Sequence, residues 1–80
     1  MKEVVLRIPE IDYVLIHWPN NELTPWVAAW SYNEERKCWG QGHYFMTKEN
    51  AINYLIEVLR ERYPIYIESI IANLELQKGD

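Results

Sequence analysis

Cys38 and His43 are the side chains whose types would support nucleophilic catalysis, as a thiol and the base that activates it. They lie five residues apart in a segment with strand character. Because side chains alternate between the two faces of a strand, an odd spacing places them on opposite faces. Only a bulge near Gly40 or Gly42 would change that phase. The spacing therefore predicts a structural Cys38 rather than a thiol enzyme.

Other pairings of reactive residue types are incomplete. His17 and His43 lack the third protein ligand that a catalytic zinc needs. The run Gly40-Gln41-Gly42 lacks the Lys-Ser/Thr and the helix that follow in a phosphate loop, so these glycines indicate a bulge or a close backbone approach. Glu34-Glu35 lies in a charged loop with no environment to separate two carboxyl pKa values. We expect no catalytic residue, no cofactor and no metal site, and no enzyme.

Large aromatic side chains gather instead around one predicted hairpin. Core packing is one interpretation, since buried Trp and Tyr contribute large apolar areas. A second is a partner surface, because Trp and Tyr lead interface hot spots. A third is stacking of single-stranded bases. The residues predicted to bind a partner are Trp26, Trp30, Tyr32, Trp39 and Tyr44.

Composition narrows the classes further. The 80 residues predict a single domain, 1–80. The net charge is −4, and residues 1–46 and 47–80 each hold six acids and four bases, so no basic stripe favours duplex nucleic acid. One cysteine precludes an internal disulfide, no apolar run reaches the ~18 residues of a membrane span, and the N-terminal run is charged and broken by Pro9. These features predict a cytoplasmic protein with no membrane segment.

Four segments have strand character. They are Glu3–Ile8, Asp12–Trp18, Trp26–Tyr32 and Cys38–Phe45. The cluster Pro19-Asn20-Asn21-Glu22 predicts a turn between the second and the third. The charged run Asn33–Lys37 predicts the loop of a hairpin.

The register of that hairpin decides what each face holds. A four-residue loop places Trp30 opposite Trp39 and Trp26 opposite His43, whereas a five-residue loop places Trp30 opposite Gly40. We favour the four-residue loop because it separates an aromatic face from a small-residue face, against which a helix could lie closely. That small-residue face would hold Val27, Ala29, Gly40 and Gly42.

The C-terminal half has helical periodicity. Thr47 is a suitable N-cap, and apolar residues recur at helical spacing from Ile52 to Tyr63, which predicts an amphipathic helix over 48–62 that ends before Pro64. The tail Ile65–Gln77 favours a second helix, with a short strand at Ile65–Ile67 as the alternative.

Together these patterns predict an α+β domain: an antiparallel meander of about four strands packed on one face by an amphipathic helix, then a C-terminal helix or strand. The leading functional hypothesis is a non-enzymatic interaction or regulatory module that uses the aromatic hairpin. Its partner would be another protein or a second copy in a homodimer. One version is a small inhibitor of a nucleic-acid enzyme from a phage or mobile element. The alternatives are a small-ligand pocket between helix and sheet, and weak binding of single-stranded nucleic acid.

Overall fold

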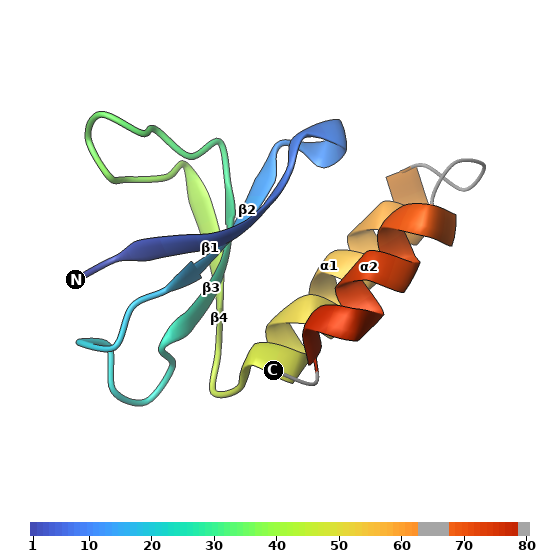
Figure 1. Cartoon of the computed structure of the whole chain (residues 1–80). Helices are drawn as coiled ribbons and strands as arrows, with labels where there is room; N and C mark the ends of the chain where they lie inside the picture. Colours follow the sequence, from blue (N-terminus) through green and yellow to red (C-terminus); the bar gives the residue numbers. More distant parts are fainter. Residues whose placement is uncertain (63–67, 79–80) are drawn as a thin grey trace.

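The chain forms a four-stranded antiparallel sheet with two helices against one of its faces, in a computed structural model that describes residues 1–62 and 68–78 (Figure 1). The strands follow one another across the sheet in the order β1-β2-β3-β4, which is a simple meander. The elements are β1 (Glu3–Ile8), the 3₁₀ turn η1 (Pro9–Ile11), β2 (Tyr13–His17), β3 (Trp26–Trp30), β4 (Gln41–Phe45), α1 (Lys48–Arg62) and α2 (Glu68–Lys78). The predicted α+β meander is confirmed.

Two elements have the bounds that periodicity predicts. The first strand spans Glu3–Ile8 and the first helix spans Lys48–Arg62. The other three strands are shorter at their ends than predicted, and most of the tail is the helix Glu68–Lys78. The alternative strand at 65–67 falls outside the described residues.

The start of α1 has the expected cap. The Oγ1 of Thr47 accepts a hydrogen bond from the backbone N–H of Asn50 at 3.1 Å, which satisfies one of the free donors of the first turn. Glu49 lies in that first turn, and Arg60 and Arg62 lie in the last, as the helix dipole favours. These local signals explain why this boundary is readable from sequence.

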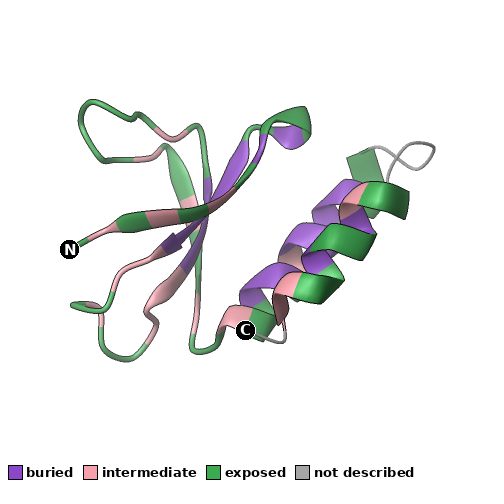
Figure 2. Cartoon of the chain, viewed as in Figure 1, coloured by how far each residue is buried: buried purple, intermediate pink, exposed green. Residues whose placement is uncertain are grey.

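The main core lies between the sheet and the helices. Figure 2 shows buried residues along the sides of α1 and α2 that face the strands. Leu15 of β2, Ala28 of β3 and Leu55 of α1 are fully buried there. Because Ala28 is small, α1 can approach the sheet closely at its centre.

Both predicted hairpin registers are wrong. β3 pairs with β4 so that Trp30 lies opposite Gln41 and Trp26 opposite Phe45. The same register continues into the connection, where the N–H of Asn33 donates to the Cys38 carbonyl at 2.7 Å. The turn therefore starts one residue later than the predicted four-residue loop. Its cause is the Asn33 side chain, whose Oδ1 accepts the Arg36 N–H at 2.9 Å and closes a local turn.

The expected placement of the helix is also wrong. α1 packs on the side of the sheet that carries Trp26, Ala28 and Phe45, and not on the small-residue side. The space above Gly42 on that other side is occupied by the Trp39 indole. A tryptophan from the hairpin connection thus covers the place that was assigned to a helix.

Candidate functional site

The sheet face turned away from the helices carries a second apolar cluster, called here the open face. Its floor is formed by strand residues, namely Val4, Val14, Ile16, Val27 and Ala29. No helix covers this face in the described part of the chain (Figure 1). Three aromatic side chains pack onto that floor instead, and they are Trp18, Tyr32 and Trp39.

Trp39 is the centre of this aromatic group. Its ring centroid lies 5.8 Å from that of Trp18 in an edge-on arrangement and 6.4 Å from that of Tyr32, which is stacked. Its Nε1–H donates to the hydroxyl oxygen of Tyr44 at 3.1 Å. We call Trp18, Tyr32, Trp39 and Tyr44 the aromatic cluster. Such offset and edge-on contacts add to the stability that burial alone provides.

A cation lies in contact with two rings of the cluster. The Lys2 ammonium is 4.9 Å from the ring centroid of Trp18 and 5.2 Å from that of Trp39. It also donates to the Lys37 carbonyl at 3.3 Å, which ties the start of β1 to the hairpin connection. The faces of the two indoles attract the positive charge. Lys2 therefore stabilises the aromatic cluster by contacts with two of its rings. Its ammonium group also places a positive charge at the edge of the cluster.

Local backbone features explain how Trp39 and Trp18 come to pack against the sheet. A Cβ at Gly42 would come within 2.7 Å of the Trp39 Nε1, so only glycine leaves room for the indole. Trp18 is placed by the turn after β2, where its N–H donates to the Pro25 carbonyl at 2.7 Å and its carbonyl accepts from Asn21 at 3.0 Å.

Trp18 is a cluster residue that sequence reasoning missed. It follows Val14 and Ile16 at a spacing of two residues, so the alternation of β2 already indicates that all three share one face. Its position at the end of the strand, directly before Pro19, concealed that signal.

The structure divides the five predicted binding residues between the two faces. Tyr32, Trp39 and Tyr44 belong to the open face. Trp26 lies on the helix side, where its ring stacks on His17 with centroids 4.3 Å apart. Trp30 is in phase with Trp26 but lies at the end of β3 and is 39% exposed. The single aromatic face that the preferred register predicted is therefore not formed.

A separate aromatic group lies where α1 meets β4. The Tyr54 ring lies 4.5 Å from His43 and 5.6 Å from Phe45, centroid to centroid. The hydroxyl groups of Tyr54 and Tyr13 are 3.4 Å apart. Burial, together with this hydrogen bond, raises the pKa of Tyr54 to about 12. The phenol is therefore neutral at physiological pH.

The two side chains with the types of a nucleophile and its base, Cys38 and His43, do not meet. Cys38 is exposed in the hairpin connection, paired through its backbone with Asn33, whereas His43 lies against Tyr54 on the helix side. Among residues 1–62 and 68–78, no three His, Cys, Asp or Glu side chains group as metal ligands.

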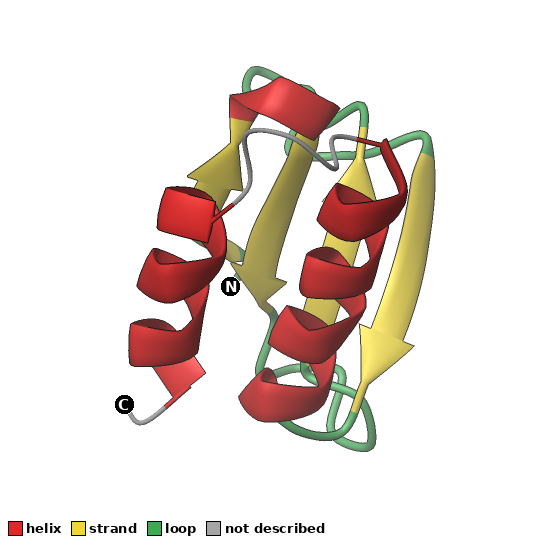
Figure 3. Ribbon diagram, turned by 90° about the vertical axis from the view of Figure 1, so that its right-hand side faces the viewer, coloured by secondary structure: helices red, strands yellow, loops and turns green. Residues whose placement is uncertain are grey.

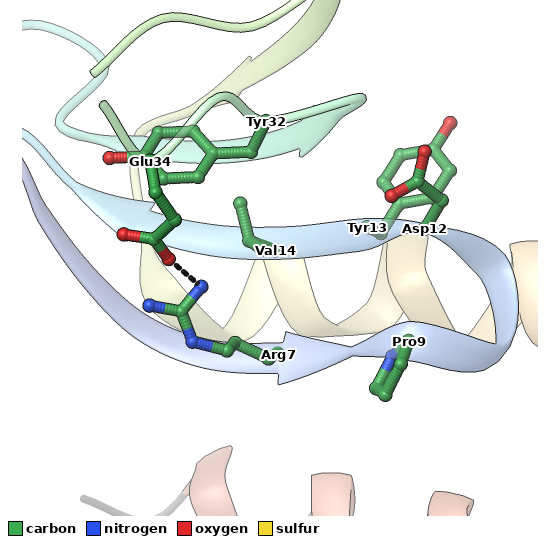
Figure 4. A pocket seen from close by; sticks show the side chains of 7 residues that line it. All are labelled: Arg7, Pro9, Asp12, Tyr13, Val14, Tyr32 and Glu34. Atoms are coloured by element: carbon green, nitrogen blue, oxygen red, sulfur yellow. Dashed lines mark ion pairs between the residues drawn. The ribbon is translucent and has the colours of Figure 1, made fainter. Parts of the chain in front are cut away.

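Two surface cavities flank β1. The first, of about 200 Å³, lies at the edge of the open face, where Arg7 and Val14 point toward Tyr32 and Glu34 (Figure 4). Arg7 and Glu34 form an ion pair across it. The second, of about 210 Å³, lies between β1 and α2. Both are smaller than the roughly 300–1,000 Å³ of small-molecule sites, and neither lies between α1 and the β3–β4 hairpin.

Comparisons with known proteins do not assign the site. No protein-family model, curated protein or solved structure matches the chain. No helix in the described segments is both long and apolar enough to span a bilayer.

Proposed function

We propose that this chain is a non-enzymatic protein-interaction module whose partner docks on the open face, over the aromatic cluster. The observation that carries the proposal is the arrangement of Trp18, Tyr32 and Trp39 on a sheet face that no described helix covers. Tryptophan and tyrosine at such a position contribute large contact areas with few rotatable bonds. Their mutual packing holds them in place before a partner arrives, which lowers the entropy cost of binding.

The charges around the cluster support a protein partner of mixed polarity. Lys2 lies beside the indoles, and Arg7 is paired with Glu34 at the nearby cavity. Exposed Glu57 and Glu68 lie on the helices, away from this face. An inhibitor that imitates a nucleic acid would need contiguous acid near its aromatic contacts. The mixture of positive and negative charges therefore favours docking of another protein over inhibition of a nucleic-acid enzyme by imitation of its substrate.

The cavity at the edge of the open face supplies one specific contact. It lies beside Tyr32, and its walls combine the apolar Val14 with the Arg7–Glu34 ion pair. A single side chain of a partner, apolar with a polar end, matches this lining. The cavity is too small for the small-ligand alternative and serves better as one pocket of a larger interface.

Site-specific photo-crosslinking tests the proposal directly. A photoreactive phenylalanine analogue replaces Tyr32 on the open face in one sample and Leu76 on α2 in the other. Leu76 is the matched control because it is 74% exposed and lies on the helical layer. After irradiation in an extract of the cells that make the protein, we expect a discrete adduct at position 32 and none of that mass at position 76.

A second substitution distinguishes specific docking from non-specific binding. Trp18→Ala should abolish the adduct at position 32 while the domain stays folded by circular dichroism. Equal labelling at positions 32 and 76, or an adduct indifferent to Trp18→Ala, would refute docking on this face. Quenching of tryptophan fluorescence by a single-stranded oligonucleotide at low salt would instead favour the nucleic-acid alternative.

A further inference from the structure

The outer side of β4 is a sheet edge that no described strand pairs with. β4 is the last strand in the order β1-β2-β3-β4, and Figure 3 shows it alone at one border of the sheet, beside α1. An edge strand presents unpaired N–H and C=O groups that can template another strand. Whether β4 can do so depends on which of its backbone groups point away from the sheet. It also depends on whether charges, prolines or bulges block pairing at this edge.

The hydrogen bonds around β3 identify the outward groups. The Trp18 N–H donates to Pro25 and the Ser31 N–H donates to Asp12, so the odd-numbered residues of β3 face β2. The even-numbered residues of β3 therefore face β4, where their partners are Gln41, His43 and Phe45. Successive residues of a strand direct their backbone groups to opposite sides. The N–H and C=O of Gly42 and Tyr44 thus point away from the sheet.

The two edges of the sheet differ in their protection. β1 has a register irregularity between Val4 and Leu6, carries Glu3 and Arg7, and is followed by Pro9. Bulges, charges and prolines are the devices that keep an edge from pairing. β4, with the sequence Gln-Gly-His-Tyr-Phe, has no Lys, Arg, Asp, Glu or Pro and pairs with β3 in an unbroken register. Within the described residues, the edge at β4 is therefore the one left open to strand addition.

We propose that β4 pairs antiparallel with β4 of a second copy of this chain, about a two-fold axis at His43. In this register Gly42 of each copy forms a hydrogen-bonded pair with Tyr44 of the other. All four outward groups of each strand are then used, in two symmetric pairs. A two-fold centred on Gly42 would place Tyr44 opposite Gly40, whose N–H already donates to the Trp30 carbonyl at 3.1 Å. A two-fold centred on Tyr44 would place Gly42 opposite Met46, beyond the strand.

The self-pairing also fits the side chains. Gly42 and Tyr44 both face the open face, so Tyr44 of the second copy lies across from the glycine that Trp39 covers. The Trp39 indole already covers that glycine, so the tyrosine ring of the second copy would lie beside the indole. The two aromatic clusters would then adjoin across the axis on one eight-stranded sheet. This self-complementarity favours a second copy over an unrelated peptide as the added strand.

The inference concerns the edge of the sheet and goes beyond the proposed docking on its face. A monomer that still crosslinks a partner through position 32 would refute the dimer alone. A dimer that captures no partner would refute the docking alone.

The decisive variant pair is Tyr44→Pro against Tyr44→Ala. Both remove the ring and its hydrogen bond with Trp39, but only proline removes the outward N–H. Proline is tolerated at an edge position whose N–H faces away from the sheet, so both variants should keep the fold. Sedimentation equilibrium across a range of concentrations should show a dimer for the wild type. The dissociation constant of Tyr44→Pro should exceed that of Tyr44→Ala by about tenfold or more, since two of four hydrogen bonds are lost.

Amide hydrogen exchange on the unmodified chain gives a test that needs no variant. In a monomer the amides of Gln41, His43 and Phe45 are protected by β3, and those of Gly42 and Tyr44 exchange freely. In the proposed dimer the latter two become protected as concentration rises. Monomeric mass at all concentrations, or fast exchange at Gly42 and Tyr44 in a dimer, would overturn the proposal. Protection of these two amides only when a partner protein is added would assign the edge to a foreign strand instead.

Discussion

Adding one methyl group at Gly42 should displace Trp39 from the open face. Built on the observed backbone, the Cβ of Gly42→Ala lies 2.7 Å from Trp39 Nε1, 3.1 Å from its Cδ1 and 3.2 Å from Val27 Cγ1. Neither Gly42 nor Gly40 has a positive φ, so backbone strain does not enter the comparison. The indole must move by several tenths of an ångström, which strains its hydrogen bond with Tyr44.

The size of the effect follows from two opposing terms. Overpacking of this kind costs about 1–3 kcal/mol, while replacing a glycine at a compatible backbone position stabilises by roughly 0.4–1 kcal/mol through the unfolded chain. We expect a net loss of about 1–2 kcal/mol in the free energy of unfolding. For a domain of this length that lowers the Tm by roughly 5–15 °C.

Gly40→Ala is the matched control. A Cβ there would meet its nearest atom, the Ser31 Cβ, at 3.5 Å, which is an ordinary contact. This variant should therefore be neutral or stabilised by about 0.5 kcal/mol. Urea unfolding at one fixed protein concentration, followed by far-UV circular dichroism, measures both variants against the wild type.

A double-mutant cycle identifies Trp39 as the cause. In a Trp39→Ala background the added methyl group no longer clashes with an indole. Gly42→Ala should then leave the free energy of unfolding unchanged or raise it slightly. The coupling between positions 39 and 42 should then be about 2 kcal/mol. Equal effects of Gly42→Ala in both backgrounds, or stabilisation of the wild type by this change, would show that the indole does not lie on the sheet.

Four further outcomes are expected from other contacts in the structure. Thr47→Ala should lower the free energy of unfolding by about 1 kcal/mol through loss of the α1 cap, measured by urea titration. Alkaline titration of tyrosinate absorbance should show one group with a pKa of about 12, absent in Tyr54→Phe. Because this pKa lies above the unfolded value of 10.0, the stabilisation is complete below pH 10 and is lost between pH 10 and about 12. Tyr13→Phe should lower that pKa, since it removes the hydroxyl next to Tyr54. Lys2→Ala should lower the free energy of unfolding by about 0.5–1 kcal/mol and change the tryptophan emission spectrum. An unchanged spectrum would show that the Lys2 ammonium does not lie over the Trp39 ring.

Local signals determined much of the fold. The bounds of β1 and α1 follow from alternation, helical periodicity, the Thr47 cap and the position of Pro64 in the sequence, all of which act within a few residues. The same patterns indicate which residues share a face. Val27 and Ala29, for example, lie together on the open face because they are two residues apart on one strand.

Tertiary structure decided which face the helices cover and where the candidate site lies. The alternation of residues along a strand shows which side chains share a face of the sheet. It does not show which of the two faces the helix packs on. Here Ala28 accommodates α1 on one side, while Gly42 receives the Trp39 indole on the other. The hairpin register depended on one Asn33 side chain closing its turn, which moved every cross-strand partner on β4. The aromatic cluster therefore arises from contacts between residues 2, 18 and 39, whose separation in sequence hides it from any local pattern.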